Sequence, residues 1–444
     1  MSEYKRMGNP GFNPVSAPDY LPMEKLRELQ TERFARIIRR AYENVPFYRK
    51  RMEDRNLTPG DIKSLDDVKH LPFTIKADLR DAYPYGLLAV PLADAVRIQS
   101  TSGTTGKPIV VAYTKSDLDV WQETMMRTMA AAGVSNDDIV QVSFGYGLFT
   151  GGLGAHYGAE GLGATVIPAS GGNTERQIML MKDFGVTVIA CTPSYFVHMI
   201  EEAGKMGIDL HKLPLRRGLF GAEPWTEEMR RHIEEGAGIK AFDIYGLSEI
   251  TGPGVGAACE CQCGLHIFED HYYPEIIDPD TLEVLPDGQE GELVLSTLSK
   301  MAMPMLRYRT RDLTSIMTEK CACGRTIRRI SKISHRSDDM FIIRGVNVFP
   351  SQIETAILNE EKNLPHYQII LTRHHGLDNV EVDIEMTQEM FSDKVSAIET
   401  LTARFSRAIE KVLGIRVAVK MLPPNSIPRS EGKAKRVIDR RNNN

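Results

Sequence analysis

The sequence predicts an α/β protein with a large N-terminal domain and a small, mobile α+β domain at the C-terminus. Three observations predict this class. Between about residues 139 and 245, short apolar runs alternate with helical patterns, which is typical of a largely parallel sheet covered by helices. After about residue 265, turn signals separate strand-like runs and indicate a β-rich subdomain. The last hundred or so residues follow a βαββαβ order, which fits a small α+β sandwich.

The composition is that of an ordinary globular protein. Of the 444 residues, 42% are hydrophobic and 25% are charged, so the chain has enough apolar side chains for a core. Lys and Arg number 54 against 59 Asp and Glu, which gives a formal net charge of −5 and no basic footprint for nucleic acid. No run of about 20 apolar residues predicts a membrane span. Because the N-terminus lacks a signal-peptide pattern, we expect a cytoplasmic protein without nucleic-acid or membrane partners.

Each element follows from a local pattern. Apolar residues at helical spacing predict an amphipathic helix within residues 24–43, and a strand-like run follows at 96–99. The α/β region is expected to contain strands at 139–143, 164–167, 186–191, 217–220 and 241–245. Its helices are expected at 175–184, 194–206 and 226–235, and the glycine-rich stretch 139–172 is interpreted as a packed, turn-rich core.

The β-rich and C-terminal regions are predicted in the same way. Strands are expected at 272–277 and 292–296, with turns between them. In the C-terminal region the expected order is a strand at 341–343, a helix from 351, strands at 367–372 and 380–386, a helix at about 393–413 and a strand at 416–421. The polar run 335–339 separates the β-rich region from the C-terminal region. We therefore expect an N-terminal domain of residues 1–335, a hinge at 336–339 and a C-terminal domain of residues 340–444.

The strongest motif is the loop from Ser100 to Pro108. It carries five hydroxyls, two glycines and a lysine directly after the strand-like run. Glycines allow close backbone approach, and successive N–H groups can form a nest that binds an anion. The loop is not a P-loop, because its glycines are too close together and Pro108 follows Lys107. The alternative interpretation is a surface turn rich in Ser and Thr.

This loop resembles the phosphate-binding signature of the adenylate-forming superfamily. Four more segments resemble motifs of that superfamily and occur in its order: Y-G-L-S-E at 245–249, Y-R-T-R-D at 308–312, R-S-D-D at 336–339 followed by Gly345, and P-R-S-E-G-K at 428–433. Arg311 stands where many members have glycine. Within the superfamily, segments 144–152, 221–225 and 344–350 are most similar to the phenylacetate–CoA ligase family.

The resemblance implies an AMP-forming ligase. Such an enzyme converts an aryl-acetic acid such as phenylacetate, with ATP and CoA, to the aryl-acetyl-CoA, AMP and pyrophosphate through an acyl-adenylate. Lys433 and Glu249 are the implied catalytic residues, and Glu249 is the implied contact of Mg²⁺, directly or through water. Two anions must be neutralised when a carboxylate attacks the α-phosphate, which explains the need for cations at this place.

The resemblance also implies a nucleotide site. Asp312 is expected to accept both ribose hydroxyls, Tyr245 to stack on adenine, and Arg336 to reach the ribose or phosphate. Asp338 is the implied hinge, and Gly345 lies in the implied CoA tunnel. The residues expected to bind nucleotide are Ser102, Gly103, Thr104, Thr105, Gly106, Lys107, Gly221, Ala222, Glu223, Pro224, Asp243, Tyr245, Gly246, Ser248, Asp312 and Arg336.

Structural explanations compete with several of these assignments. Lys433 lies on a basic tail, in which Lys435 is the nearest competitor, and charge runs are usually solvated faces. Glu249 would otherwise cap a helix, and Asp312 would close a turn. An acyl pocket is expected where aromatic residues alternate with glycines, which have no side chain. Aromatic core residues at strand spacing would give the same sequence pattern. The residues expected in the pocket are Phe144, Tyr146, Gly147, Phe149, Pro253 and Gly254.

The cysteines predict a structural zinc site. Two C-x-C-G segments occur at 261–264 and 321–324 in a chain without a secretory signal, which favours metal over disulfides. A tetrahedral Zn²⁺ needs four thiolate or imidazole ligands, and we favour both Cys321 and Cys323 among them. The candidates are Cys259, Cys261, Cys263, His266, Cys321 and Cys323. Cys191 is expected to be a buried core residue.

Other functions stay open at this point. One is a nucleotidyltransferase of the coenzyme F390 synthetase type, which moves AMP onto a deazaflavin; another is an enzyme that acylates a carrier protein. A third is an inactive, zinc-stabilised interaction module, against which the presence of Lys433, Asp312 and Glu249 argues. The exact acid, the resting orientation of the C-terminal domain and the oligomeric state are not fixed by the sequence, which leaves a homodimer open.

Overall fold

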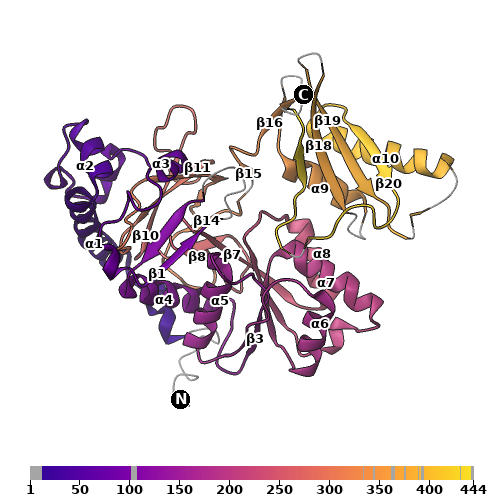
Figure 1. Cartoon of the computed structure of the whole chain (residues 1–444), viewed down its shortest axis with the longest axis horizontal. Helices are drawn as coiled ribbons and strands as arrows, with labels where there is room; N and C mark the ends of the chain where they lie inside the picture. The colour runs from indigo at the N-terminus through magenta and orange to yellow at the C-terminus, as the bar shows by residue number, and fades with distance from the viewer. Residues whose placement is uncertain are drawn as a thin grey trace.

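The protein has two bodies, a large N-terminal one and a small C-terminal one (Figure 1). The computed structural model describes residues 13–101, 108–333, 335–343, 346–361, 366–374, 377–388, 390–391, 395–430 and 432–441. A nine-stranded sheet lies at the centre of the large body. Within the described ranges, no helix combines the length and the apolar character needed to cross a bilayer.

The central sheet is half parallel and half antiparallel. Its order is β13-β14-β9-β8-β7-β6-β5-β3-β4, and the strands from β4 to β7 run parallel. The parallel strands are β3 Ile139–Val142, β4 Thr165–Ile167, β5 Val188–Cys191, β6 Arg217–Gly221 and β7 Lys240–Leu247. The antiparallel strands are β8 Gly252–Ala257, β9 Leu265–Ile267, β13 Ile316–Met317 and β14 Arg329–Ile330.

The helices of the parallel half form at the expected places. They are α6 Thr174–Asp183, α7 Pro193–Lys205 and α8 Glu227–Ala237. Thr226 caps α8 by accepting a hydrogen bond from the backbone N–H of Met229, and Gly238 ends the helix in the left-handed conformation. The cluster that these helices form with the sheet includes Cys191, which is buried as expected.

Among the helices that were not expected, the longest are α4 Lys115–Ala131 and α5 Thr150–Gly161. The interpretation of residues 139–172 as a packed, turn-rich core is wrong in part, because five of its ten glycines lie in α5 and the other five lie in loops and turns. Glycine is a poor helix former, but here it permits contact with α4: a Cβ on Gly158 would lie 2.6 Å from the Cβ of Met125. Thr114 caps α4 and accepts a hydrogen bond from the N–H of Asp117. Close packing therefore overrides local propensity in this region.

The remaining parts of the large body are a second sheet, a hairpin and an N-terminal layer of helices. The second sheet is antiparallel, in the order β10-β11-β12-β15. Its strands are β10 Tyr272–Ile277, β11 Gly291–Thr297, β12 Tyr308–Thr314 and β15 His335–Arg336, and the hairpin consists of β1 Arg97–Ser100 and β2 Val110–Tyr113. The helical layer comprises α1 Met23–Asn44, α2 Pro46–Glu53 and α3 Lys76–Asp81. Short 3₁₀ helices lie at Pro14–Tyr20, Pro59–Asp61, Leu65–His70, Leu92–Asp94 and Leu210–Lys212.

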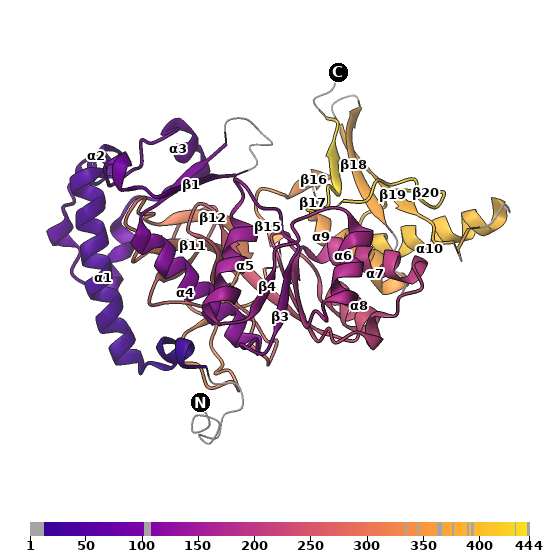
Figure 2. The ribbon, with the colours of Figure 1, turned by 60° about the horizontal axis from the view of Figure 1, so that its bottom comes forward.

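The C-terminal body has its own sheet and its own core. A hairpin of β16 Phe341–Ile343 and β17 Val346–Val348 precedes a four-stranded sheet in the order β20-β19-β18-β21. Its elements are α9 Pro350–Glu360, β18 Tyr367–His374, β19 Leu377–Glu385, α10 Val395–Leu413, β20 Ala418–Leu422 and β21 Val437–Asp439, the last of which was not expected. This body lies beside α6, α7 and α8 of the large one (Figure 2).

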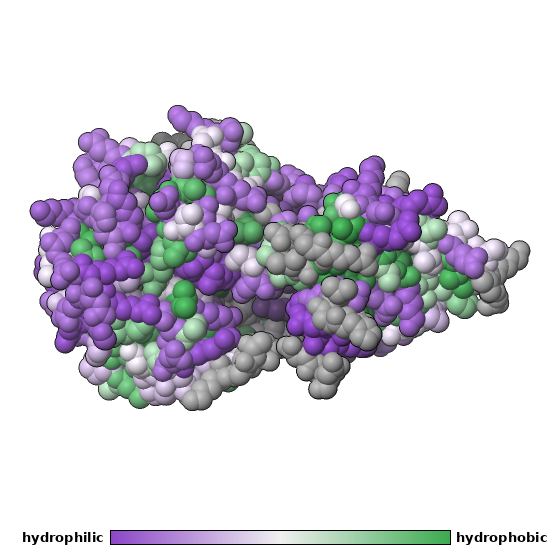
Figure 3. Space-filling view, turned by 90° about the horizontal axis from the view of Figure 1, so that it is seen from above, coloured by the Kyte–Doolittle hydropathy of each residue, from purple (hydrophilic) through white to green (hydrophobic). Residues whose placement is uncertain are grey.

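Seen from above, the surface of the large body is mostly hydrophilic, with apolar residues scattered over it (Figure 3). The buried apolar residues fall into separate clusters. Three belong to the large body, one of them a small group around Cys259 and Cys321, and a fourth lies within the C-terminal body. Leu358 of α9 crosses the boundary and packs against the cluster formed by α6, α7 and α8. The two bodies therefore share little apolar surface among the described residues.

Candidate active site

The candidate site lies at the carboxyl ends of β5, β6 and β7. In open α/β sheets this edge is the usual place for ligands, because loops there diverge and helix N-termini point toward it. Thr192 follows β5, Glu223 follows β6, and Tyr245 lies near the carboxyl end of β7. Gly246 is required by close packing, since a Cβ there would lie 2.1 Å from the carbonyl oxygen of Gly252.

Three of the expected nucleotide-binding residues form one hydrogen-bonded group. The hydroxyl of Tyr245 donates to Oδ2 of Asp312 at 2.6 Å, and the guanidinium of Arg336 donates to Oδ1 at 2.8 Å. Asp312 and Arg336 are paired across β12 and β15. Burial raises the pKa of Asp312, whereas the charge of Arg336 and the bond from Tyr245 oppose that rise. Arg336 also donates to Asp338 at 3.0 and 3.1 Å, so the group reaches into the expected hinge.

Glu223 connects the two bodies. Its Oε1 accepts hydrogen bonds from the N–H and the hydroxyl of Ser194, at the start of α7. Its Oε2 accepts from the N–H of Ala434 at 2.9 Å. Ala222 before it has a φ of 70°, in the left-handed region that L residues rarely adopt. The sequence predicted Glu223 as a nucleotide contact and did not predict that it holds the C-terminal loop.

Lys433 lies in that loop, directly before Ala434. The carbonyl of Gly432 accepts a hydrogen bond from the hydroxyl of Thr192 at 3.0 Å. The side chain of Lys433 is exposed, yet the surrounding chain desolvates the ammonium and lowers its pKa. Attraction by Glu223 and Glu249 opposes this shift. The two expected catalytic side chains, Lys433 and Glu249, therefore act on each other electrostatically.

Glu249 is buried, with 6% of its surface exposed, and its environment is cationic. Its Oε1 lies 3.8 Å from Nζ of Lys76. Its carbonyl oxygen accepts a hydrogen bond from Nζ of Lys300 at 3.1 Å. Burial lowers the pKa of Lys300 to about 8, although Asp117 and Glu249 attract its charge. A buried carboxylate of this kind is suited to holding a cation near anionic substrates.

The expected acyl-pocket residues lie around the start of α5 but differ in exposure. Phe144 is 7% exposed and packs under Gly151, whereas Phe149 is 49% exposed. The hydroxyl of Tyr146 lies 3.1 Å from Nδ1 of His156. A Cβ on Gly147 would meet no atom within 4 Å, although its φ of 96° disfavours any side chain there.

Two further acyl candidates lie on the neighbouring strand. Pro253 in β8 pairs with Gly246, and its carbonyl oxygen accepts a hydrogen bond from the indole N–H of Trp121 at 2.8 Å. Gly254 follows it with a φ of 93°. Ser248 is tied to the start of α5, because its hydroxyl lies 3.1 Å from that of Thr150. The segment at 144–152 and the end of β7 are therefore adjacent.

Several expected residues cannot be placed. The phosphate-loop residues Ser102, Gly103, Thr104, Thr105, Gly106 and Lys107 lie outside the described residues, as does Gly345 of the expected CoA tunnel.

Asp243 lies in β7 at the edge of the site. It is half-buried, and burial raises its pKa.

The structure brings four of the six candidate metal ligands together. The ligand atoms of Cys259, His266, Cys321 and Cys323 all lie within 4.8 Å of one another. The sulfur atoms of Cys259 and Cys321 are 3.6 Å apart, and Sγ of Cys323 lies 3.3 Å from Nε2 of His266. A tetrahedron with zinc–sulfur bonds of about 2.3 Å separates its ligands by about 3.8 Å, which matches this spacing.

The other two candidates lie at the rim of the cluster. Cys261 is exposed, and Cys263 accepts a hydrogen bond from the guanidinium of Arg329 at 2.9 Å. Nδ1 of His266 lies 3.3 Å from the carbonyl oxygen of Ile327. A hydrogen bond there fixes the ring so that Nε2 faces the thiols, as outer partners of metal-binding histidines commonly do.

Comparisons with known proteins identify the family. Residues 47–303 match the family model of AMP-binding enzymes, and residues 345–441 match that of the AMP-binding enzyme C-terminal domain. A phenylacetate–coenzyme A ligase of Thermus thermophilus is 49% identical over 95% of this chain and 98% of its own length. That of Pseudomonas putida is 51% identical over 94% of this chain and 95% of its own length.

The chain belongs to the phenylacetate–coenzyme A ligase family. It is thus an AMP-forming acid–thiol ligase of the adenylate-forming superfamily, and the expected α/β fold class is confirmed. The nucleotidyltransferase alternative is not favoured, because a curated Escherichia coli relative, 49% identical over 95% of this chain and 96% of its own length, is also a phenylacetate–coenzyme A ligase.

Two solved structures of a related ligase, in two different states, are similar to this phenylacetate–coenzyme A ligase family member to different degrees. A 2-hydroxyisobutyryl-CoA ligase in the postadenylation state, with a bound acyl-adenylate, matches with a TM-score of 0.90 at 28% identity, over 97% of this chain and 94% of that one. The same ligase in the thioesterification state matches with a TM-score of only 0.71 at 30% identity, over 96% and 92%. Identity and coverage are alike in the two matches, so the chain is more similar to the structure in the postadenylation state.

Some residues of the site were missed in the sequence. Thr192 and Ser194 hold the loop of Lys433, and Lys76 faces Glu249. The signal for the first two is T-P-S directly after an apolar strand, where proline begins a helix and hydroxyls face the edge of the sheet. Lys76 carries no such signal, since it begins α3, far from the site in the sequence.

Proposed function

We propose that the protein is an aryl-acetate–CoA ligase with phenylacetate as its leading substrate. It would use ATP and CoA in the cytoplasm and release AMP and pyrophosphate. The observation that carries this proposal is the identity of about half of all positions to phenylacetate–coenzyme A ligases over nearly the whole of both chains.

The proposed chemistry assigns one task to each part of the site. The ammonium of Lys433 lies between the substrate carboxylate and the α-phosphate and reduces their repulsion. Asp312 accepts the ribose hydroxyls, with Tyr245 and Arg336 holding its two oxygens in place. Glu249 is the proposed contact of Mg²⁺, which would supply further positive charge at the phosphates.

The acyl group is proposed to bind beside the start of α5. Phe144 and Tyr146 offer ring faces there, and bare backbone at Gly147 leaves room beside them. No carboxylate occurs within residues 144–152 to meet an amino group. Phenylalanine would therefore bring an unpaired charge into the pocket, at a cost of order several kcal/mol. Acetate would leave the pocket unfilled and lose roughly 0.8 kcal/mol of burial per CH₂-sized group.

A carboxylate panel tests the proposal. Phenylacetate, ring-substituted and indole analogues, phenylalanine and acetate are each supplied with ATP and Mg²⁺, and pyrophosphate and thioester are scored separately with and without CoA. We expect phenylacetate to have a far higher kcat/KM than phenylalanine or acetate. Equal turnover of acetate and phenylacetate would place the acyl pocket elsewhere, and AMP transfer to a deazaflavin would restore the alternative.

We also propose that Cys259, His266, Cys321 and Cys323 bind one structural Zn²⁺. Four soft ligands at tetrahedral spacing leave no open position for substrate, which is typical of structural and not catalytic zinc. The ion would join the loop after β8 to the loop before β14, because the four ligands come from these two segments and β9. It would thereby stabilise the antiparallel half of the central sheet.

Metal analysis tests this assignment. Freshly purified protein is expected to contain one zinc per chain. Cys321→Ser should remove the metal and lower Tm by several degrees, whereas Cys261→Ser, which changes an exposed thiol of the same region, should keep both. Absence of zinc from chelator-free protein, or equal loss in the two variants, would refute the assignment.

A further inference from the structure

One acidic side chain of the large body faces two separate segments of the C-terminal body. Glu201 lies on α7, and its Oε1 accepts a hydrogen bond from Nε2 of His366 at 2.7 Å. Its Oε2 lies 3.8 Å from Nε of Arg429 and 3.9 Å from Nδ1 of His198. The side chain of Glu201 is 29% exposed and that of His366 is 22% exposed, so water screens this group only in part.

The carboxyl group of Glu201 carries a charge. Burial alone would raise the pKa of Glu201, but the hydrogen bond from His366, the nearby ring of His198 and the charges of His366 and Arg429 lower it to about 2. Arg429 is fixed within its own domain, because its Nη2 donates to Oε1 of Glu385 at 2.6 Å. Glu201 therefore meets a guanidinium whose position is already set, which reduces the entropy lost on contact.

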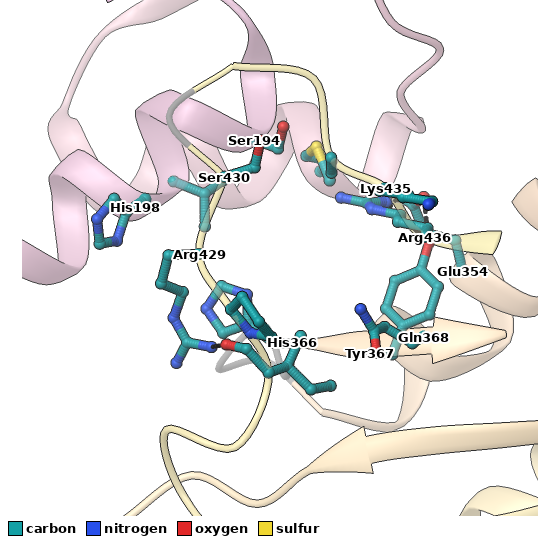
Figure 4. A pocket seen from close by; sticks show the side chains of 15 residues that line it. Ser194, His198, Glu354, His366, Tyr367, Gln368, Arg429, Ser430, Lys435 and Arg436 are labelled. Carbon is teal, nitrogen blue, oxygen red and sulfur yellow. Dashed lines mark hydrogen bonds and ion pairs between the residues drawn. The ribbon is translucent and has the colours of Figure 1, made fainter. Parts of the chain in front are cut away.

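The contact is directly connected to the proposed catalytic loop. Figure 4 shows His198 on α7, opposite His366 and Arg429, around a small cavity of about 60 Å³. Arg429 precedes Lys433 by four residues in the same loop. Beyond Arg429, Gly432 and Ala434 of this loop form hydrogen bonds with the large body through their backbone groups.

We propose that Glu201 is a positioning residue that holds the C-terminal domain, and with it Lys433, in the orientation for adenylation. The proposal rests on the proposed function, since it assigns Glu201 to the first of two half-reactions. Glu201 touches neither substrate nor reacting atoms. It acts through His366 and Arg429, and these contacts cannot persist when the C-terminal domain turns away for thioester formation.

Separate assays of the two half-reactions test the proposal. Glu201→Gln keeps the shape of the side chain but removes its charge. We expect the rate of pyrophosphate release to fall by roughly tenfold, as for the loss of one charge-assisted hydrogen bond. Thioester formation from supplied acyl-adenylate should be unchanged or faster. The KM for ATP should change little, because the nucleotide contacts are untouched.

The chain offers a matched control at the next position. Glu202 lies on the same helix, and within the described part of the chain its carboxylate forms an ion pair only with Lys205 of that helix, at 2.6 Å. Glu202→Gln should leave both half-reactions unchanged. His366→Gln attacks the same contact from the other domain and should reproduce the effect of Glu201→Gln, with little added effect in the double variant.

Hydrogen–deuterium exchange of the full-length chain gives a readout independent of activity. Peptides covering residues 429–441 should exchange faster in Glu201→Gln than in wild type or Glu202→Gln. This result can be obtained even if no aryl acid is turned over, so a failure of the proposed function is distinguishable. Equal loss of both half-reactions in Glu201→Gln, or unchanged exchange in that variant, would overturn the proposal.

Discussion

At the scale of single residues, the site depends on how each charge is compensated. Asp312 is the clearest case, because burial raises its pKa while Arg336 and Tyr245 stabilise its ionised form. When the pH falls through this raised pKa, the carboxylate gains a proton and can no longer accept both ribose hydroxyls. As the pH is lowered, the activity should therefore begin to fall at a higher pH than it would for an aspartate with an ordinary pKa.

The pH dependence of the KM for ATP checks this prediction. In wild type the KM should rise as the pH is lowered. Asp312→Asn should raise the KM by about tenfold to a hundredfold at neutral pH, as expected for a hydrogen bond to a charged group, and should flatten its pH dependence. Asp278→Asn, in the half-exposed turn after β10, is the control. If the KM of the wild type for ATP did not change as the pH was lowered, Asp312 would not be the residue that holds the ribose.

Lys433 gives a second prediction at this scale. Lys433→Ala should slow adenylate formation by roughly a hundredfold or more, the usual effect of removing a group that stabilises transition-state charge. Thioester formation from supplied acyl-adenylate should remain largely intact, because the lysine acts only in the first step. Lys435→Ala should be mild. A parallel loss of both steps in Lys433→Ala would contradict the assignment.

The roles of residues could be predicted from the sequence where a motif contains them. They could not be predicted where they depend only on which residues come close together in the fold. Tyr245, Asp312 and Arg336 were expected at the nucleotide, and they do form one group. Six metal candidates could not be reduced to four from spacing, because which thiols meet depends on how β9 and β14 pair. The second task of Glu223, as acceptor for Ala434, depends on contact between domains and has no local signal.

At the scale of elements, the strands of the parallel half were predictable because buried strands are continuous apolar runs. The helix α5 was not predictable, because short stretches rich in glycine have the local pattern of turns. Its glycines are explained only by α4, against which they pack. Likewise β21 is short and is paired with β18 across a long stretch of sequence, so no local pattern indicates it.

The packing of α5 on α4 leads to a stability prediction. A Cβ on Gly158 would lie 2.6 Å from the Cβ and 3.0 Å from the carbonyl carbon of Met125. Gly158→Ala should therefore lower the free energy of unfolding by about 1–3 kcal/mol, as overpacking does. Gly204→Ala on α7 meets no atom within 4 Å and should instead stabilise by up to about 1 kcal/mol. Thermal and denaturant unfolding would measure both, and a stabilised Gly158→Ala would contradict the packing.

At the scale of the whole molecule, the C-terminal body is nearly independent. Its buried cluster is separate from those of the large body. Among the described residues, Leu358 is an apolar side chain that packs across the boundary. Scanning calorimetry should therefore show more than one transition, with the small domain unfolding on its own. A single peak whose calorimetric and van't Hoff enthalpies agree would indicate that the domains unfold together.

The place of Arg336 has a consequence for the order in which products leave. One guanidinium holds Asp312 on one side and Asp338 on the other, at the point where the small domain joins the large one. A turn about the backbone between them alters both bonds at once. Under the proposed function, domain rotation and nucleotide binding are coupled through this one side chain, so we expect AMP to be released more readily once the domain has turned than before.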